Sequence, residues 1–260
     1  MQGILTISWK HLRVLLILTL ALTGCDGNGG ESGNMGTAVK LAVAADFAEV
    51  AELLGSDFTA RTGITVSVTS DSSGALTSQI RSGAEFDVFL SADTGFPQQL
   101  IEEGLAVPEP VVYAIGTLAL FSRDRDLSTD AISLLASGAF PRLAVADPEK
   151  APYGRAAIQT LESLGLLDQL EETLVFAENV GKALELVETG MADAGFVAFP
   201  DIGGNQARAW LVPARMHEPI EQAAVVLSNA PDRDSADRWM DYLISDPARL
   251  IIKDAGYRLP

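Results

Sequence analysis

The chain has 260 residues and a formal net charge of −17, with 35 acidic and 18 basic residues. The basic residues are scattered, which argues against binding to the phosphate backbone of nucleic acid. One cysteine excludes an intrachain disulfide, and one cysteine with two histidines cannot supply a structural zinc site. With 48% apolar and 7% aromatic residues, the composition favours a well-packed α/β protein with one large or two modest domains.

Residues 1–24 predict a secretory signal peptide. Lys10 and Arg13 precede a short apolar run at 14–21, and the segment ends in Leu22-Thr-Gly-Cys25. The run is shorter than the roughly 20 apolar residues that a membrane-spanning helix needs. The tetrapeptide resembles the bacterial lipobox, and this resemblance implies that Cys25 is lipidated and becomes the mature N-terminus. The glycine-rich polar stretch at 25–37 then predicts a flexible tether.

From Val39 onward, short β-rich runs alternate with segments of helical periodicity. In the first half of the chain, this pattern predicts strands at 40–45, 64–69 and 86–90, and helices at 47–62, where Gly63 is the stop signal, and at 75–82. The pattern then starts again, with strands at 142–146, 174–177 and 195–199 and helices at 155–164 and 182–189. Strands separated by helices indicate βαβ units and mostly parallel sheets, here arranged as two lobes.

Two glycine pairs with the same spacing give weak support for paired lobes: Gly74 with Gly83, and Gly181 with Gly190. Apolar stretches at 113–122 and 223–227 are suited to cross from the first lobe to the second and back, and predicted helices around 238–244 and 248–252 rejoin the first lobe. We therefore expect lobe I to comprise residues 38–117 with 222–260, and lobe II to comprise residues 118–221.

Four predicted strand-to-helix turns carry small or polar residues at 45–47, 72–74, 152–154 and 179–181. In open parallel sheets, ligands bind beyond the carboxyl ends of the strands, where free N–H groups at helix starts converge. Together the four turns would form a cage for a small anion that needs no cationic side chain. In the alternative interpretation, Asp46, Ser73 and Asn179 are ordinary helix N-caps and the glycines are ordinary turn residues.

Several motifs resemble the periplasmic molybdate-binding proteins of ABC transporters over nearly all of the chain from Val39. They are Leu41-Ala-Val-Ala-Ala-Asp-Phe47, Asp71-Ser-Ser-Gly-Ala-Leu76 with Gln79-Ile80, Phe86-Asp-Val-Phe-Leu-Ser-Ala-Asp93, Leu143-Ala-Val-Ala-Asp-Pro148, Ala151-Pro-Tyr-Gly154 and Glu178-Asn-Val180. The resemblance implies a two-lobed binding protein of type II that closes on one tetrahedral oxyanion held by neutral donors. It implies ligand contacts from the turn at Asp46, the hydroxyl and N–H of Ser73, Tyr153, and the N–H of Val180.

Two positions depart from that family pattern. Asp46 places a carboxylate where an anion should arrive. We expect it to turn away and cap the helix that starts at Phe47; the alternative is that it accepts a proton carried by the ligand, as hydrogen phosphate would offer. Ala198 stands where some family members have a tyrosine. Tyr153 either supplies that phenol or packs on the rim of its turn.

An enzyme is a weaker interpretation. Once the signal peptide is removed, His217 is the only histidine, and it lies in a polar stretch typical of a surface loop. Neighbouring carboxylates such as Glu102-Glu103 and Glu171-Glu172 point in different directions on a helix. A third class, a tethered structural protein, would gain no stability from a ligand.

The sequence thus predicts a non-enzymatic, extracytoplasmic solute-binding lipoprotein. We expect it to be a monomer anchored to the membrane through Cys25, to capture molybdate or tungstate, and to deliver the oxyanion to an ABC transporter permease. It needs no cofactor and binds no free metal cation, since molybdenum arrives only within the oxyanion. The alternative ligand is another tetrahedral oxyanion such as phosphate or sulfate.

Overall fold

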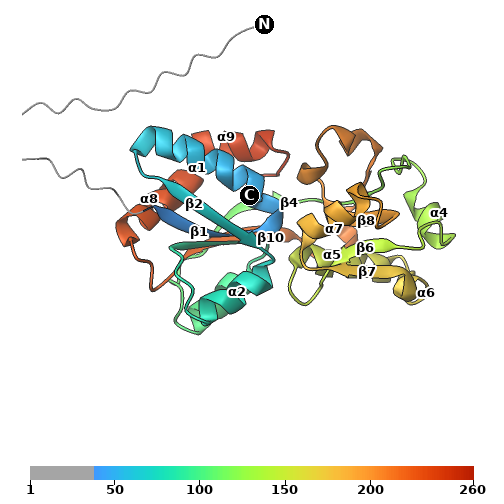
Figure 1. Cartoon of the computed structure of the whole chain (residues 1–260), viewed down its shortest axis with the longest axis horizontal. Coiled ribbons are helices and arrows are strands. Elements are labelled where there is room, and N and C mark those ends of the chain that lie inside the picture. Colours follow the sequence, from blue (N-terminus) through green and yellow to red (C-terminus); the bar gives the residue numbers. More distant parts are fainter. Residues whose placement is uncertain (1–37) are drawn as a thin grey trace, which may run out of the picture. The chain divides into compact units, whose positions relative to one another are not determined.

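The computed structural model describes residues 38–260. The predicted signal peptide, Cys25 and most of the predicted tether lie outside the described residues. The described chain forms two lobes, each built on one five-stranded sheet with helices on both faces (Figure 1). This architecture confirms the predicted fold class of a two-lobed α/β protein.

The sheet of lobe I has a parallel centre and an antiparallel side. Strands β1 (Val39–Ala44), β2 (Val66–Asp71) and β3 (Val88–Ser91) run parallel, with β1 in the middle. Next to β3 lie β10 (Ile220–Val226) and then β4 (Val111–Gly116), each antiparallel to its neighbour. The parallel strands have βα connections, and their carboxyl ends therefore meet at one edge of the sheet.

Lobe II repeats this plan. Strands β6 (Leu143–Ala146), β7 (Leu174–Ala177) and β8 (Ala194–Ala198) run parallel, with β6 in the middle. Strand β5 (Leu118–Phe121) is antiparallel to β8, and the short β9 (Trp210–Leu211) pairs with β5. The repetition brings the carboxyl ends of a second set of parallel strands to one edge, as in lobe I.

Both faces of each sheet are covered, because successive side chains of a strand point to opposite faces. In lobe I, Leu41 and Val43 pack under α1 (Ala48–Thr62), α8 (Arg233–Leu243) and α9 (Asp246–Asp254). Ala42 faces the opposite core under α2 (Ser73–Arg81) and α3 (Gly95–Glu102).

In lobe II, Leu143 and Val145 face the core formed with α4 (Ala131–Ala136), α5 (Pro152–Ser163) and α6 (Leu167–Leu170). Ala144 faces α7 (Val180–Glu188) and the 3₁₀ segment η3 (Pro200–Arg208). Three shorter 3₁₀ turns are η1 (Ala45–Phe47), η2 (Glu171–Thr173) and η4 (Ala214–Met216).

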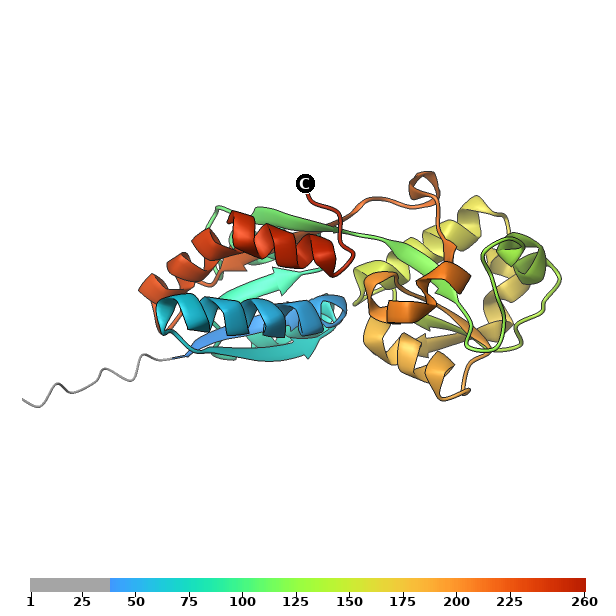
Figure 2. The ribbon, with the colours of Figure 1, turned by 90° about the horizontal axis from the view of Figure 1, so that it is seen from above.

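Two chain segments connect the lobes (Figure 2). Strand β4 of lobe I continues into β5 of lobe II after the single residue Thr117. The chain returns through the segment that follows η4 and enters the lobe I sheet at Ile220, opposite Gly116. Within residues 38–260, no helix combines the length and the apolar character that crossing a membrane requires.

Most of the predicted elements are present, and the exceptions concern the start of one helix and some short helices. Helix α1 ends at Gly63, which adopts the left-handed conformation (φ 76°) expected of a glycine stop. Helix α5 begins at Pro152 rather than at Arg155, since proline suits the first helical position, where no N–H partner is needed. The predictions did not include α3 or α4, which are short helices of 8 and 6 residues.

Candidate anion-binding site

A small cavity of about 10 Å³ lies where the two lobes meet. It has room for only a few atoms, which favours a small ligand. The four residues predicted to contact a ligand, Asp46, Ser73, Tyr153 and Val180, all border it. The complete lining is Ala44, Ala45, Asp46, Ser72, Ser73, Ala92, Ala151, Pro152, Tyr153, Asn179 and Val180.

Helices α2, α5 and α7 all begin at this cavity. The first N–H groups of a helix have no acceptor within the helix, and the helix dipole makes its N-terminus favourable for negative charge. Ser72 caps α2 by accepting from the N–H of Ala75, and Asn179 caps α7 by accepting from that of Lys182. Within the described chain, the N–H groups of Ser73 and Val180 donate to no acceptor at these helix starts, so they remain available to an anion.

Ser73 is not the cap of α2, contrary to the alternative interpretation of the sequence. Its side chain is buried, and its hydroxyl oxygen accepts a hydrogen bond from the N–H of Ala92 at 3.0 Å. This contact uses the oxygen as an acceptor and leaves the hydroxyl proton free. Ser73 can therefore donate both from its hydroxyl and from its N–H.

Tyr153 lies in the first turn of α5 with only 2% of its surface exposed. Among the described residues, its hydroxyl makes no hydrogen bond of normal geometry, although it lies near the Asp46 carboxyl. Burial, and after it the negative charge of Asp46, raises the pKa of this hydroxyl well above its usual value, so it remains a neutral donor. A buried hydroxyl without a partner is costly, and one beside a cavity indicates a ligand that accepts its hydrogen bond.

The prediction that Asp46 caps the next helix is wrong. Asp46 lies within η1, while Ala44 and Phe47 occupy the cap positions of η1 and α1, and neither helix has a side-chain cap. The Asp46 carboxyl, 3% exposed, instead accepts a hydrogen bond from Nε2 of Gln222. The Tyr257 hydroxyl donates to the main-chain oxygen of Asp46 at 2.6 Å and lies 3.2 Å from Oδ2.

Burial raises the pKa of Asp46 to about 6, although hydrogen bonds from the side chains of Gln222, Tyr257 and Tyr153 and from the backbone of Asp46 itself oppose the shift. None of the residues that line the cavity is a lysine, arginine or histidine. Among residues 38–260, no cluster of acidic, histidine or cysteine side chains could hold a metal ion. The donors available to an anion are therefore neutral N–H and O–H groups.

Two hydrogen bonds near this cavity also join the lobes. The N–H of Gly74 at the start of α2 donates to the main-chain oxygen of Lys150 in lobe II at 2.8 Å. A side chain on residue 74 would collide with the Lys150 backbone, which explains the glycine. Nδ2 of Asn179 donates to Asp71 of lobe I at 3.3 Å.

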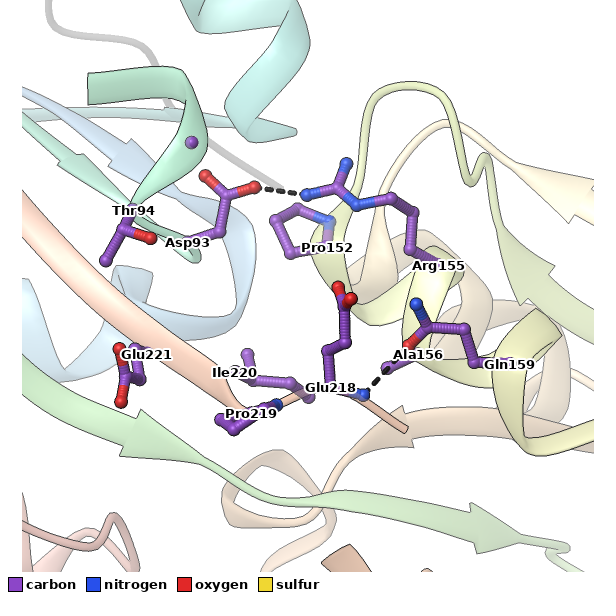
Figure 3. Close-up of a pocket in the computed structure, with 11 residues that line it drawn as sticks. Asp93, Thr94, Pro152, Arg155, Ala156, Gln159, Glu218, Pro219, Ile220 and Glu221 are labelled. Atoms are coloured by element: carbon purple, nitrogen blue, oxygen red, sulfur yellow. Dashed lines mark hydrogen bonds and ion pairs between the residues drawn. The ribbon is translucent and has the colours of Figure 1, made fainter. Parts of the chain in front are cut away.

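A larger cavity of about 480 Å³ adjoins the small one at Pro152 (Figure 3). An ion pair between Asp93 of lobe I and Arg155 of lobe II lies in its wall, and Arg155 also lies over the ring of Phe96. Oε1 of Gln159 accepts from the N–H of Glu218 at 2.9 Å. The pair of Asp93 and Arg155 makes the larger cavity part of the space between the lobes.

Sequence reasoning missed Gln222, Tyr257, and the pair of Asp93 and Arg155. Gln222 had a usable signal, since it is a polar residue in the otherwise apolar inner face of β10 and is fully buried. Tyr257 had none, because its role depends on a contact with a residue 211 positions earlier in the chain.

Two lobes joined by two connections, with neutral donors around a small cavity between them, define a two-lobed solute-binding protein. The chain belongs to the family of bacterial extracellular solute-binding proteins, whose sequence profile matches residues 39–258. The prediction of a binding protein rather than an enzyme agrees with this family.

The similar proteins include molybdate-binding relatives. The molybdate-binding protein ModA of Rhodobacter capsulatus is 38% identical over 244 residues, which cover 93% of this chain and 92% of the relative. ModA of Azotobacter vinelandii is 35% identical over 260 residues, 97% of this chain and 99% of the relative. The solved structure of the Azotobacter vinelandii periplasmic molybdate-binding protein superposes with a TM-score of 0.82, over 85% of this chain and 99% of that one, at 38% identity. The sulfate-binding protein SubI of Mycobacterium tuberculosis shares the fold at 11% identity (TM-score 0.73, covering 86% of this chain and 87% of that one).

Proposed function

We propose that this protein captures molybdate, and tungstate of the same shape and charge, and delivers the oxyanion to an ABC transporter permease. One observation carries the proposal: Asp46 and Ser73 of lobe I and Tyr153 and Val180 of lobe II border one small cavity that no cationic side chain lines. A site of this kind suits a compact tetrahedral anion that neutral donors surround. The similarity to ModA proteins supports the same ligand class.

In this proposal, residues 38–117 with 222–260 and residues 118–221 are the two bodies that close on the anion. Ser73 binds it through its hydroxyl and N–H, Val180 through its N–H, and Tyr153 through its hydroxyl. Sulfate binds less well, because its shorter bonds leave its oxygens further from these donors and hydrogen bonds weaken steeply with distance.

We further propose that the protein works outside the cytoplasm as a monomer. Residues 1–24 serve as the signal peptide, Cys25 carries the lipid that anchors the chain to the membrane, and residues 25–37 form the tether. The lipobox-like sequence before Cys25 supports this placement.

Thermal unfolding of the purified protein with molybdate, tungstate, sulfate or phosphate tests the function. A ligand at 100 times its Kd that binds only the folded state adds about 2.7 kcal/mol of stability. We expect large, similar shifts in Tm with molybdate and tungstate and a smaller one with sulfate. Equal shifts with sulfate and molybdate would contradict the assignment.

Hydrogen phosphate is a second candidate ligand, which the Asp46 carboxyl at the cavity wall favours. This anion carries a proton that it can donate to a carboxylate, whereas molybdate carries none at neutral pH. Calorimetric titration with both anions decides between them. If the protein binds phosphate more tightly than molybdate, phosphate is the ligand.

A further inference from the structure

The Asp46 carboxyl is held in one orientation by residues far away in the sequence. The Tyr113 hydroxyl donates to Oε1 of Gln222 at 3.0 Å, and this contact turns Nε2 of Gln222 toward Asp46. Oδ2 of Asp46 accepts from that Nε2 and lies beside the Tyr257 hydroxyl, so it is already used as an acceptor. Among residues 38–260, the hydrogen bond from Gln222 and the close contact with Tyr257 both involve Oδ2, and the Tyr153 hydroxyl also lies near the carboxyl. Oδ1, which the contacts with Gln222 and Tyr257 do not use, is therefore the oxygen that can carry a proton.

The tyrosines around this carboxyl supply no positive charge. Tyr113 on β4, Tyr153 on α5 and Tyr257 after α9 are all buried. For each of them, burial, and after it the negative charge of Asp46, raises the pKa of the hydroxyl well above its usual value. They stay neutral at any physiological pH.

The charged groups on the other neighbouring elements do not compensate Asp46 either. Asp201 on η3 is an acid, and burial together with the negative charges of Asp46 and Glu49 raises its pKa well above its usual value. Glu49, in the first turn of α1, adds another negative charge. On α7, which packs against η1, Lys182 is exposed and paired with Glu185. Among residues 38–260, the groups named here place acids and no buried base around Asp46, which lines the cavity.

A dianion in this cavity would stand beside the Asp46 carboxyl with little water between them. Like charges at short range disfavour the ionised form of an acid, and burial disfavours it as well. A neutral carboxyl has the opposite effect, because its O–H group is one more hydrogen-bond donor for the anion.

We propose that Asp46 binds the oxyanion as a neutral carboxylic acid, which takes up one proton from solvent as the anion enters and donates a hydrogen bond from Oδ1. The inference rests on the proposed function and adds the protonation state of the site. Asp46 is then a ligand-contacting residue that couples anion capture to proton uptake. No covalent bond other than the new O–H bond forms.

Calorimetric titration with sodium molybdate tests this inference. Titrations at pH 8 in buffers with different enthalpies of ionisation report the number of protons taken up with each anion. We expect about one proton per molybdate at pH 8, and an affinity that falls about tenfold per pH unit above the pKa of the empty site. In Asp46→Asn, we expect binding to persist, tighter than in the parent at pH 8, with no proton uptake.

Asp201→Asn is the matched control, because it removes the neighbouring buried acid and leaves Asp46 in place. Proton uptake should persist in this variant. Uptake that disappears in Asp201→Asn and persists in Asp46→Asn would overturn the inference, as would molybdate binding by the parent without proton uptake. The proposed function would survive both results, whereas absence of molybdate binding by the parent would overturn both proposals.

Discussion

The hydroxyl of Tyr153 in lobe II lies so close to Gly116 in lobe I that a Cβ atom on residue 116 would overlap it. Gly116 is the last residue of β4, just before the chain crosses between the lobes. The glycine therefore lets a side chain at the anion cavity pack directly against the crossing segment.

Gly116→Ala should weaken molybdate binding by about tenfold or more, because the new methyl group displaces the Tyr153 hydroxyl from the cavity. Overpacking of this kind also costs about 1–3 kcal/mol of stability. Calorimetric titration and urea unfolding measure the two effects. Gly204→Ala is the matched control, since a Cβ atom there meets no atom within 4 Å and both quantities should stay unchanged. An unaltered affinity in Gly116→Ala would show that the hydroxyl is not held by this contact.

Tyr153→Phe should separate the effect of the hydroxyl on the empty protein from its effect on the complex. The hydroxyl makes no hydrogen bond of normal geometry in the described chain, so the ligand-free variant should be as stable as the parent or more stable. Loss of one hydrogen bond to the anion should reduce affinity by about 1–2 kcal/mol, roughly tenfold. Tyr242→Phe, which removes a hydroxyl bonded to Asp57, should lower stability and leave affinity unchanged. A destabilised empty Tyr153→Phe variant would contradict the prediction.

The pKa of Asp46 predicts how stability without ligand depends on pH. The pKa rises from 3.8 to about 6 on folding, so between these values the folded protein binds more protons than the unfolded chain. The contribution of Asp46 therefore decreases as pH rises through this window, by about 3 kcal/mol, and stays constant above it. Urea unfolding at pH 5 and pH 8 measures this effect. The free energy of unfolding of Asp46→Asn, relative to that of the parent, should be higher at pH 8 than at pH 5. If the free energies of unfolding of the variant and the parent differed equally at both pH values, the Asp46 carboxyl would not be a buried group without a compensating charge.

Arg155→Gln should weaken molybdate binding a few-fold by removing the ion pair with Asp93 that links the lobes. The Arg155 side chain is 39% exposed and the Asp93 side chain 17%, which limits such a pair to about 0.2–1 kcal/mol. The loss should be largest at low salt and is measured by titration at two ionic strengths. Arg142→Gln removes a similar pair with Asp193 inside lobe II and should leave affinity unchanged. Equal losses in the two variants would exclude a specific role between the lobes.

Cys25→Ser should abolish lipid attachment and release the protein from the membrane, while molybdate binding remains. Metabolic labelling with a radioactive fatty acid measures the first effect clearly, because the chain has no other cysteine. Label that persists in the variant would place the lipid elsewhere.

The four strand-to-helix turns that border the cavity could be predicted from the sequence because each depends on local rules, whereas the individual contact residues within them were implied by the family resemblance. A strand, a turn with serine, asparagine or glycine, and a helix start are readable from short windows, and parallel topology gathers such turns at one edge. The position of Asp46 was predictable for the same reason. Its hydrogen bonds were not, because Gln222 lies 176 residues and Tyr257 211 residues further along the chain.

The same physical limit explains the missed helices and ion pair. Helix α4 has 6 residues and buries only Ala131 and Leu135, too little for a periodic pattern to stand out. The pair of Asp93 and Arg155 joins two lobes, and no local pattern in either lobe specifies which charged residues face the other.

The hydrogen bond from Tyr257 to the main-chain oxygen of Asp46 also has a consequence in time. Residue 258 pairs with Ile115 through two main-chain hydrogen bonds, which fix this last segment against β4. A growing polypeptide therefore acquires every residue that lines the cavity, the last of which is Val180, well before it acquires the hydroxyl that holds the main-chain oxygen of Asp46.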